Sequence, residues 1–389
     1  MDLSTQPLPP EFVLRPSSTP GTGSVERARV LISGYYGFGN LGDEALLEVI
    51  VERLRRDFPA ASIEVLSATP QRTAAAYRVD ATARWDWRAV RTAIGRADVV
   101  LSGGGGLLQN ETSLRSLLYY AAVLREAIRS GRKAMIFAQS IGPLDFWGRW
   151  VVRGFCRGLD RATVRDERSL RLLKDLLPGA PVERTADPVF LYDRPAARDD
   201  LAADGLGPES GAYAVISVRK AASFRDGIPV LARAVDRLAD RHNVRAAFLP
   251  LGGAPDAALS TDVIRACSSA PVLLPECTLE KAAAILQGAR LAIGMRLHAL
   301  VLAARFAVPF LAIPYDPKVT ALCEDLDYPL QPLWIPGRPR PSDGAIDALV
   351  DRLVSERDRL SAALAQRLPV VQAAAERNFE VLGELLDDE

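Results

Sequence analysis

The sequence predicts an α/β protein made of two doubly wound, Rossmann-like domains that face a cleft. Short apolar runs recur along the chain, and each is followed by a turn rich in glycine or polar residues and then by a helical pattern. The series stops at a polar stretch over 193–211 and then starts again. Repeated strand–turn–helix units are typical of open parallel sheets. With 389 residues, 49% of them apolar and 25% charged, the chain is long enough for two such domains.

The predicted strands are short apolar runs of the kind that parallel sheets bury on both faces. In the first domain, 28–195, we expect strands at 29–33, 63–66, 98–102 and 134–137 and helices over 45–58, 114–129 and 147–159. In the second domain, 210–340, we expect strands at 213–218, 245–249, 272–274, 291–293 and 310–313. Residues 1–27 predict a flexible leader, and 341–389 predict a C-terminal segment of one or two helices.

Charge and composition exclude several classes of protein. The net charge is zero, whereas a nucleic-acid-binding protein usually shows a concentrated basic face. The four cysteines form no Cys-x-x-Cys pair and there are only two histidines, so we expect no metal site. The first residues lack a signal-peptide pattern, and the longest apolar stretch, 299–314, is shorter than the ~20 residues of a spanning helix. We therefore expect a cytoplasmic protein, soluble or peripheral at the membrane.

The turn at 294–298 is the strongest candidate site. A strand ending at Ile293 is followed by Gly294, Arg296 and His298 and then by a helical run. Unpaired N–H groups at the start of a helix and an arginine bind an anion together, and a histidine exchanges protons near neutral pH. The alternative is a salt-bridged Arg296 beside a buried His298.

The turn from Gly37 to Asp43 also separates a strand from a helix. Its three glycines fit the Gly-x-Gly-x-x-Gly pattern of dinucleotide sites, and an acid lies about 20 residues further on at Glu64. However, Asp43 would repel a pyrophosphate. We expect Asp43 either to cap the helix or to act as a base on a neutral sugar hydroxyl, with equal weight on both.

Further strand ends carry neutral or cationic groups. Gly103 to Gly106 and the pair Gln139–Ser140 suit sugar hydroxyls, because ligands of such sheets bind beyond the carboxyl ends of the strands. Arg165, Arg219 or Lys220, and Lys318 are candidate cations for an anionic substrate. For Arg165, a structural ion pair with Asp187 is an equally good interpretation.

Together, these motifs resemble the polysaccharide pyruvyl transferase family, of the cell-surface-anchoring (CsaB) type. The resemblance covers roughly 29–335 and rests on 37–44, 103–106, 139–143, Arg165-Asp166, Asp187-Pro188, Arg219, 294–298 and Tyr315-Asp316 with Lys318. It implies a glycosyltransferase-B-like fold and transfer of the pyruvyl group of phosphoenolpyruvate to a sugar as a 4,6-ketal. For this type it implies a β-linked N-acetylmannosamine in a lipid-diphosphate-linked cell-wall precursor, for anchoring of a surface layer. The leader and the C-terminal segment do not match the pattern.

In this interpretation His298 is the general acid and Asp43 the base. The expected phosphoenolpyruvate ligands are Arg165, Arg219, Gly294, Arg296 and Lys318. The expected acceptor-binding residues are Gly39, Asn40, Gly42, Gly104, Gly105, Gln139 and Ser140. Phosphoenolpyruvate is a co-substrate, and no cofactor is expected.

Arginines at 149, 153, 157 and 161 recur every four residues beside Phe146, Trp147, Trp150 and Phe155. This pattern indicates a basic, aromatic-edged helix that contacts the inner membrane surface, or else an ordinary solvated arginine face.

Two other functions remain open. A nucleotide-sugar-dependent glycosyltransferase of the same architecture would need an acid near the ribose, for which Glu276 and Glu280 are candidates. A non-enzymatic sugar-binding protein would not need the converging cations Arg219, Arg296 and Lys318.

Overall fold

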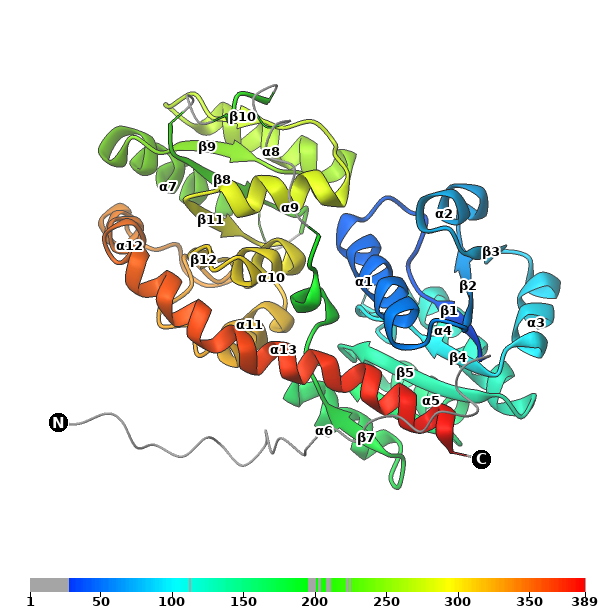
Figure 1. The fold of residues 1–389 in the computed structure, drawn as a ribbon. Helices are drawn as coiled ribbons and strands as arrows, with labels where there is room; N and C mark the ends of the chain where they lie inside the picture. The colour runs from blue at the N-terminus through cyan, green and yellow to red at the C-terminus, as the bar shows by residue number, and fades with distance from the viewer. Residues whose placement is uncertain are drawn as a thin grey trace.

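The computed structural model describes residues 28–111, 113–194, 201, 204–207, 211–221, 224 and 226–388. The predicted leader lies outside these residues. Two separate parallel sheets with alternating helices are present, so the predicted two-sheet α/β fold is confirmed. We call the part built on the first sheet the N-lobe and the part built on the second sheet the C-lobe (Figure 1).

The N-lobe sheet has seven parallel strands in the order β3-β2-β1-β4-β5-β6-β7. Its strands are β1 Arg29–Ser33, β2 Ser62–Ser67, β3 Asp80–Ala83, β4 Val99–Ser102, β5 Lys133–Gln139, β6 Arg161–Val164 and β7 Val182–Arg184. Its helices are α1 Leu41–Asp57, α2 Pro70–Tyr77, α3 Trp87–Arg96, α4 Leu114–Arg129, α5 Phe146–Phe155, α6 Glu167–Leu176 and the 3-10 helix η2 Pro188–Leu191. The strand order reverses between β1 and β4, which is where open α/β sheets form their ligand crevice.

Both faces of this sheet are buried because successive side chains of a strand point to opposite faces. Val30 and Ile32 pack with α1 and the C-terminal helix, whereas Leu31 packs with α3 and α4. Each apolar strand is thereby covered by helices on both sides, which explains why strands such as Val99–Ser102 carry continuous apolar runs.

The C-lobe sheet has five parallel strands in the order β10-β9-β8-β11-β12. Its strands are β8 Tyr213–Ser217, β9 Arg245–Phe248, β10 Val272–Leu273, β11 Leu291–Gly294 and β12 Phe310–Ala312. Its helices are α7 Gly227–His242, α8 Ala254–Ala266, α9 Leu279–Gly288, α10 Leu297–Arg305, α11 Pro317–Asp325 and α12 Asp343–Ser355. Here the order reverses between β8 and β11.

The last helix, α13 (Arg357–Asp387), joins the two lobes (Figure 1, red). Near its start, Ser361 donates a hydrogen bond to the Ala307 carbonyl of the C-lobe. Further along, Asn378 donates to the Ala186 carbonyl of the N-lobe, and Phe379 packs against Phe137 of β5. The predicted C-terminal segment is thus two helices, of which the second lies against both lobes.

The lobes also meet at the start of α1. The Leu41 amide donates a hydrogen bond of 3.0 Å to the Leu251 carbonyl, which follows β9. Leu46 and Val49 of α1 belong to the same apolar cluster as α9 and α10. The turn that begins α1 is therefore held directly against the C-lobe.

In the N-lobe, the sequence-based prediction missed three short strands, β3, β6 and β7, and the helices α2, α3 and α6. It also extended one helix too far. The helix predicted over 147–159 is α5, which ends at Phe155, and Arg161 belongs to β6 and pairs with Asp388. The regular arginine spacing through 161 is therefore not a helical stripe.

Candidate active site

Three turns of the C-lobe lie side by side because their strands are paired in register. Gly294 of β11 pairs with Ser217 of β8 on one side and with Ala312 of β12 on the other. The residues that follow these strands are Arg219, Arg296 and Tyr315. Parallel strands end at one edge, so the predicted cationic turns meet at the carboxyl edge of this sheet.

Arg219 and Lys318 both lie close to the Tyr315 side chain. The Nη1 of Arg219 donates to the Tyr315 hydroxyl at 2.7 Å, and its guanidinium lies 5.2 Å from the ring centre. The Lys318 Nζ is 5.9 Å from the same ring and 3.2 Å from Asp316 Oδ2. Because tyrosine is a neutral partner, the charge of Arg219 remains available to an anion.

His298 is the second residue of α10 and reaches across to the N-lobe. Its Nε2 is buried and lies 3.4 Å from Asp187 Oδ2. Its ring rests on Gly42 at the start of α1, where any Cβ atom would overlap the Nδ1 atom. Gly42 is therefore required for the close approach of His298, independently of any ligand.

Arg165 and Asp187 form a buried ion pair that the histidine joins. Their side chains are 6% and 5% exposed, and the Nη1 of Arg165 donates to Asp187 Oδ2. The Nε of Arg165 donates to the Ser140 hydroxyl at 2.8 Å. Although burial alone would raise the pKa of Asp187, the charges of Arg165 and His298 hold that pKa well below its usual range. Asp187 is therefore a fixed negative charge beside His298.

Asp43 lies in the first turn of α1 but does not cap it. The cap is Asn40, whose Oδ1 accepts from the Gly42 amide at 3.2 Å, so the capping alternative for Asp43 is wrong. Burial raises the pKa of Asp43 to about 6, while the nearby charges of His298, Lys318 and Arg165 act in the opposite direction. Asp43 is therefore within electrostatic reach of cationic groups from both lobes.

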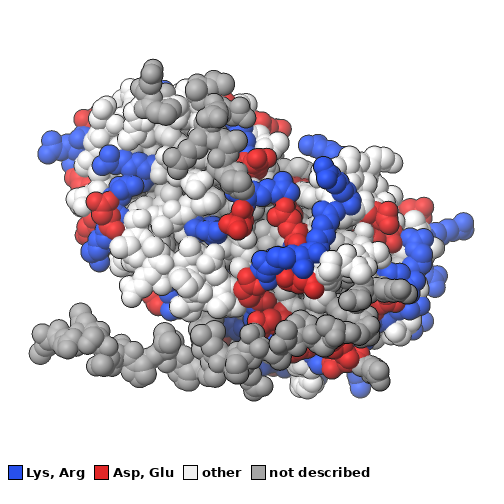
Figure 2. Space-filling view, in the orientation of Figure 1, with Lys and Arg blue, Asp and Glu red and all other residues white. Residues whose placement is uncertain are grey.

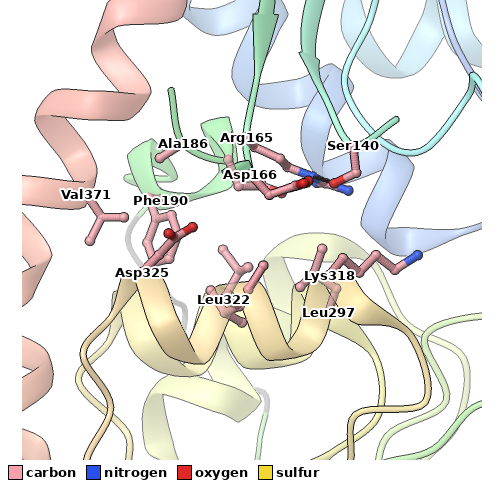
Figure 3. A pocket seen from close by; sticks show the side chains of 13 residues that line it. Ser140, Arg165, Asp166, Ala186, Phe190, Leu297, Lys318, Leu322, Asp325 and Val371 are labelled. Carbon is pink, nitrogen blue, oxygen red and sulfur yellow. Dashed lines mark hydrogen bonds and ion pairs between the residues drawn. The ribbon is translucent and has the colours of Figure 1, made fainter. Parts of the chain in front are cut away.

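A hollow lies between Arg165 of the N-lobe and Lys318 of the C-lobe (Figure 3). Its lining does not include Asp43, Arg219 or His298. Arg165 and Ser140 of the N-lobe line one side, and Lys318 and Leu297 of α11 and α10 line the other. Asp325, Phe190 and Val371 close the end away from Lys318. The hollow opens to solvent and leaves about 20 Å³ for the centres of water-sized molecules.

The glycine turns of the N-lobe leave space near Asp43. Gly105 has φ +110°, and a Cβ there would lie 3.1 Å from Asp43 Oδ1. A Cβ at Gly104 would contact Leu46, whereas Gly39, with φ +76°, faces open space. The structure thus brings Gly105 to Asp43, while Gly104 serves the packing of α1.

Gln139 points into the sheet. Its Nε2 donates to the carbonyl and the hydroxyl of Ser102 at 2.8 Å each, and its side chain is fully buried. Its Oε1 has no hydrogen-bond partner among the described residues. The geometry therefore gives Gln139 a role in joining β4 to β5, next to Ser140, which does line the hollow.

Arg296 faces away from the hollow. Its Nε and Nη2 each donate to Asp256 at 2.7 Å, and this acid is almost completely buried. Gly252 leaves room for the guanidinium, because a Cβ there would overlap it. Sequence reasoning did not identify Asp256. The available signal was its position four residues after Gly252, the first of two glycines that follow β9.

Among the described residues, no group of three or more His, Cys, Asp or Glu side chains is placed to hold a metal ion. None of the helices in that part of the chain is long and apolar enough to cross a membrane. Glu276 and Glu280, the candidate ribose ligands, are both exposed near the start of α9.

Comparisons with known proteins agree with this geometry. The family model described as polysaccharide pyruvyl transferase matches residues 40–317. A comparison with curated protein sequences finds no match. Solved structures with the same fold include Anabaena HepE in complex with UDP-glucose, at 11% identity and a TM-score of 0.62 over 92% of this chain and 100% of that one. They also include S. aureus MnaA with UDP, at 10% identity and a TM-score of 0.61 over 90% and 94% of the two chains.

Proposed function

We propose, because the chain belongs to the polysaccharide pyruvyl transferase family, that it transfers the pyruvyl group of phosphoenolpyruvate to a sugar of a polysaccharide precursor. The observation that carries this proposal is the convergence of Asp43 and Arg165 from one lobe with His298 and Lys318 from the other. Such a set offers a base, a proton donor and cations, of which Arg165 and Lys318 line the hollow.

Phosphoenolpyruvate carries a carboxylate and a phosphate on one carbon, so its site needs several cations. Lys318 and Arg219, both close to Tyr315, supply two of them, and Arg165 supplies a third from the N-lobe. The helix that starts after Gly294 adds backbone N–H groups. Arg296 supports this turn from behind, because two of its nitrogens are already bound to Asp256.

In the proposed reaction His298 donates a proton to the methylene carbon, which makes C2 an oxocarbenium-like centre. The first sugar hydroxyl attacks C2 while Asp43 accepts its proton, and the C2–O bond to phosphate then breaks. The second hydroxyl attacks the same carbon and closes the ketal. The proton that Asp43 takes from the first hydroxyl then replaces, on His298, the one given to the methyl group, and the proton of the second hydroxyl leaves with the phosphate, so atoms and charge balance. The pKa of Asp43, about 6, suits a base that works near neutral pH.

The resemblance to the cell-surface-anchoring type supports a specific acceptor, β-linked N-acetylmannosamine on a lipid diphosphate, modified as a 4,6-ketal on the cytoplasmic side of the membrane. The acceptor sits against the glycine turns in this proposal. The residues assigned to it are Gly39, Asn40, Gly42, Gly104, Gly105 and Ser140, with Gln139 behind them.

The test is phosphate release from phosphoenolpyruvate with and without an N-acetylmannosamine acceptor. We expect acceptor-dependent release, and a product that is heavier than the acceptor by one pyruvyl ketal in mass spectrometry. Lys318→Met should raise the KM for phosphoenolpyruvate by about 10- to 100-fold, the value of one charge-assisted contact. If no pyranoside acceptor supports phosphate release and a UDP-sugar raises the Tm of the protein, the glycosyltransferase alternative is favoured instead.

A further inference from the structure

Large apolar side chains are exposed mainly at one end of the N-lobe. Of the eleven exposed large hydrophobic residues in the described part of the chain, nine belong to the turn after β1, the turn before α3 or the first turns of α3, α4 and α5. We call these nine residues the aromatic rim: Tyr35, Phe38, Trp85, Trp87, Leu114, Leu118, Phe146, Trp147 and Trp150. Contiguous exposed apolar surface of this kind marks an interaction site.

The rim is continuous because its helices are neighbours. The helices α3, α4 and α5 follow β3, β4 and β5 and cover the same face of the sheet, where their side chains form one cluster. Their first turns therefore lie at the carboxyl edge, the same edge that carries Asp43 and Ser140. Within α5, Phe146, Trp147 and Trp150 are 73%, 59% and 61% exposed. The rim thus lies at the edge of the sheet that carries the candidate active site.

One end of the rim is rigid. Arg84 is buried, and its guanidinium lies 4.9 Å from the Trp85 ring centre and 5.1 Å from that of Phe38. It also donates to the Gly34 carbonyl at 2.8 Å. Trp85 is nevertheless 68% exposed, so an indole ring is fixed in position and presented to solvent. Exposing a ring in a fixed position costs free energy that only a partner can offset.

The three helices that bear the rim are strongly basic. Together α3, α4 and α5 contain eight arginines, one glutamate, no lysine and no aspartate. Beside them, Asp86 and Asp145 accept hydrogen bonds from the first turns of α3 and α5 as caps, and Glu64 and Asp175 form ion pairs with Arg96 and Arg149. Over the face seen in Figure 2, by contrast, basic and acidic side chains lie intermixed on both lobes. Arg153 and Arg157 are exposed, and Arg149 is 44% exposed beside Asp175.

We propose that the aromatic rim docks the protein on an anionic phospholipid bilayer. Tryptophan and phenylalanine side chains are the ones that enter the headgroup region, and arginines around them attract the negative surface. Because the rim lies at the edge of the sheet that carries the site, docking would place the site at the height of a lipid-linked sugar. The proposal rests on exposure and charge and stands without the proposed function, although it gives that function a route to its acceptor.

Intrinsic fluorescence tests the proposal directly, because four of the five tryptophans belong to the rim and the fifth, Trp334, is buried in the C-lobe. We expect the full chain to show a blue shift with vesicles containing phosphatidylglycerol and quenching by brominated lipids. Phosphatidylcholine vesicles should bind more weakly, and added salt should remove the difference between the two lipids. Phe146→Ala/Trp147→Ala/Trp150→Ala should weaken sedimentation with vesicles by at least about tenfold. Arg149→Gln/Arg153→Gln should weaken it by about fivefold per arginine.

Matched controls come from the C-lobe. Leu273→Ala/Ile335→Ala removes the two exposed hydrophobic residues of the described chain that lie outside the rim, and Arg338→Gln/Arg340→Gln removes two exposed arginines. Neither control should change vesicle binding. Vesicle binding that survives the triple alanine variant, or no blue shift with any vesicle, would overturn the proposal. Concentration-dependent self-association that the same variant abolishes would assign the rim to a second copy of the chain and overturn it equally.

Discussion

Two buried arginine–aspartate pairs, Arg165–Asp187 and Arg296–Asp256, lie at the carboxyl edges of the two sheets and look alike at first. Both arginines follow a strand, and both acids are at most 5% exposed. The difference is in what surrounds them. Arg165–Asp187 lines the hollow and receives His298 from the other lobe, whereas Arg296–Asp256 is enclosed within the C-lobe beside Gly252.

This difference shows that burial and pairing do not identify a functional charge. An enclosed pair satisfies its own charges and fixes a turn, which is a structural task. A pair that lines a hollow, and whose carboxylate oxygen also contacts a histidine, can interact with a charged ligand. The predictions below separate the two cases, beginning with the largest effect.

Replacing His298 tests the pair that lines the hollow, Arg165–Asp187. His298→Gln retains a side chain of similar size over Gly42 but cannot donate a proton as an acid. We expect kcat to fall by about 10²–10⁴-fold, the usual contribution of general acid catalysis, with a much smaller change in the KM for phosphoenolpyruvate. Steady-state phosphate release measures both. A kcat within a factor of three of wild type would make His298 a packing residue.

Replacing Asp256 tests the enclosed pair. Asp256→Ala leaves Arg296 buried without its partner, so we expect the free energy of unfolding to fall by about 3–5 kcal/mol in denaturant titrations. The double variant Arg296→Met/Asp256→Leu, which removes both charges, should recover most of that loss. We also expect it to raise the KM for phosphoenolpyruvate less than Lys318→Met does. A larger rise in KM for the double variant would show that Arg296 itself binds the substrate.

The smallest effect concerns Asp43 and pH. Burial raises the pKa of Asp43 to about 6, so its charged form is disfavoured in the folded protein, and its contribution to stability is lost as pH rises through 6. Asp43→Asn should therefore stabilise the protein by about 3 kcal/mol at pH 8 and by nothing at pH 3, measured as a difference in Tm. The wild-type kcat/KM should decrease as the pH is lowered through about 6, because Asp43 becomes protonated. Equal Tm differences at both pH values would contradict the assigned pKa.

Much of the fold follows from the sequence because buried parallel strands are continuous apolar runs. All nine predicted strands are present, with ends that differ by at most two residues. The three missed strands are short or polar. Asp80–Ala83 and Val182–Arg184 lie at the two edges of the sheet, where no continuous apolar run is needed. No residue of the first is buried, and two of the three residues of the second are partly exposed.

The candidate site was predicted less completely. Sequence reasoning identified the turns, because strand ends are recognisable, and it brought Arg165 together with Asp187. It did not pair Arg296 with Asp256, since these residues are 40 positions apart and meet only because β9 and β11 both flank β8. Nor could it tell that Gln139 turns into the sheet while Ser140 lines the hollow, because alternation of side chains depends on the register of β5.

The helix α13 has a mechanical consequence. Its C-lobe contacts, from Ser361 and Arg367, precede Pro369, and its N-lobe contacts, from Arg377 and Asn378, follow it. Proline has no N–H group, so the helix lacks one internal hydrogen bond at the point where it passes from one lobe to the other. The helix that connects the two lobes is thus weakened at Pro369, between its contacts with one lobe and its contacts with the other. For the cleft to widen, α13 has to bend at Pro369 or lose its contacts with one of the lobes.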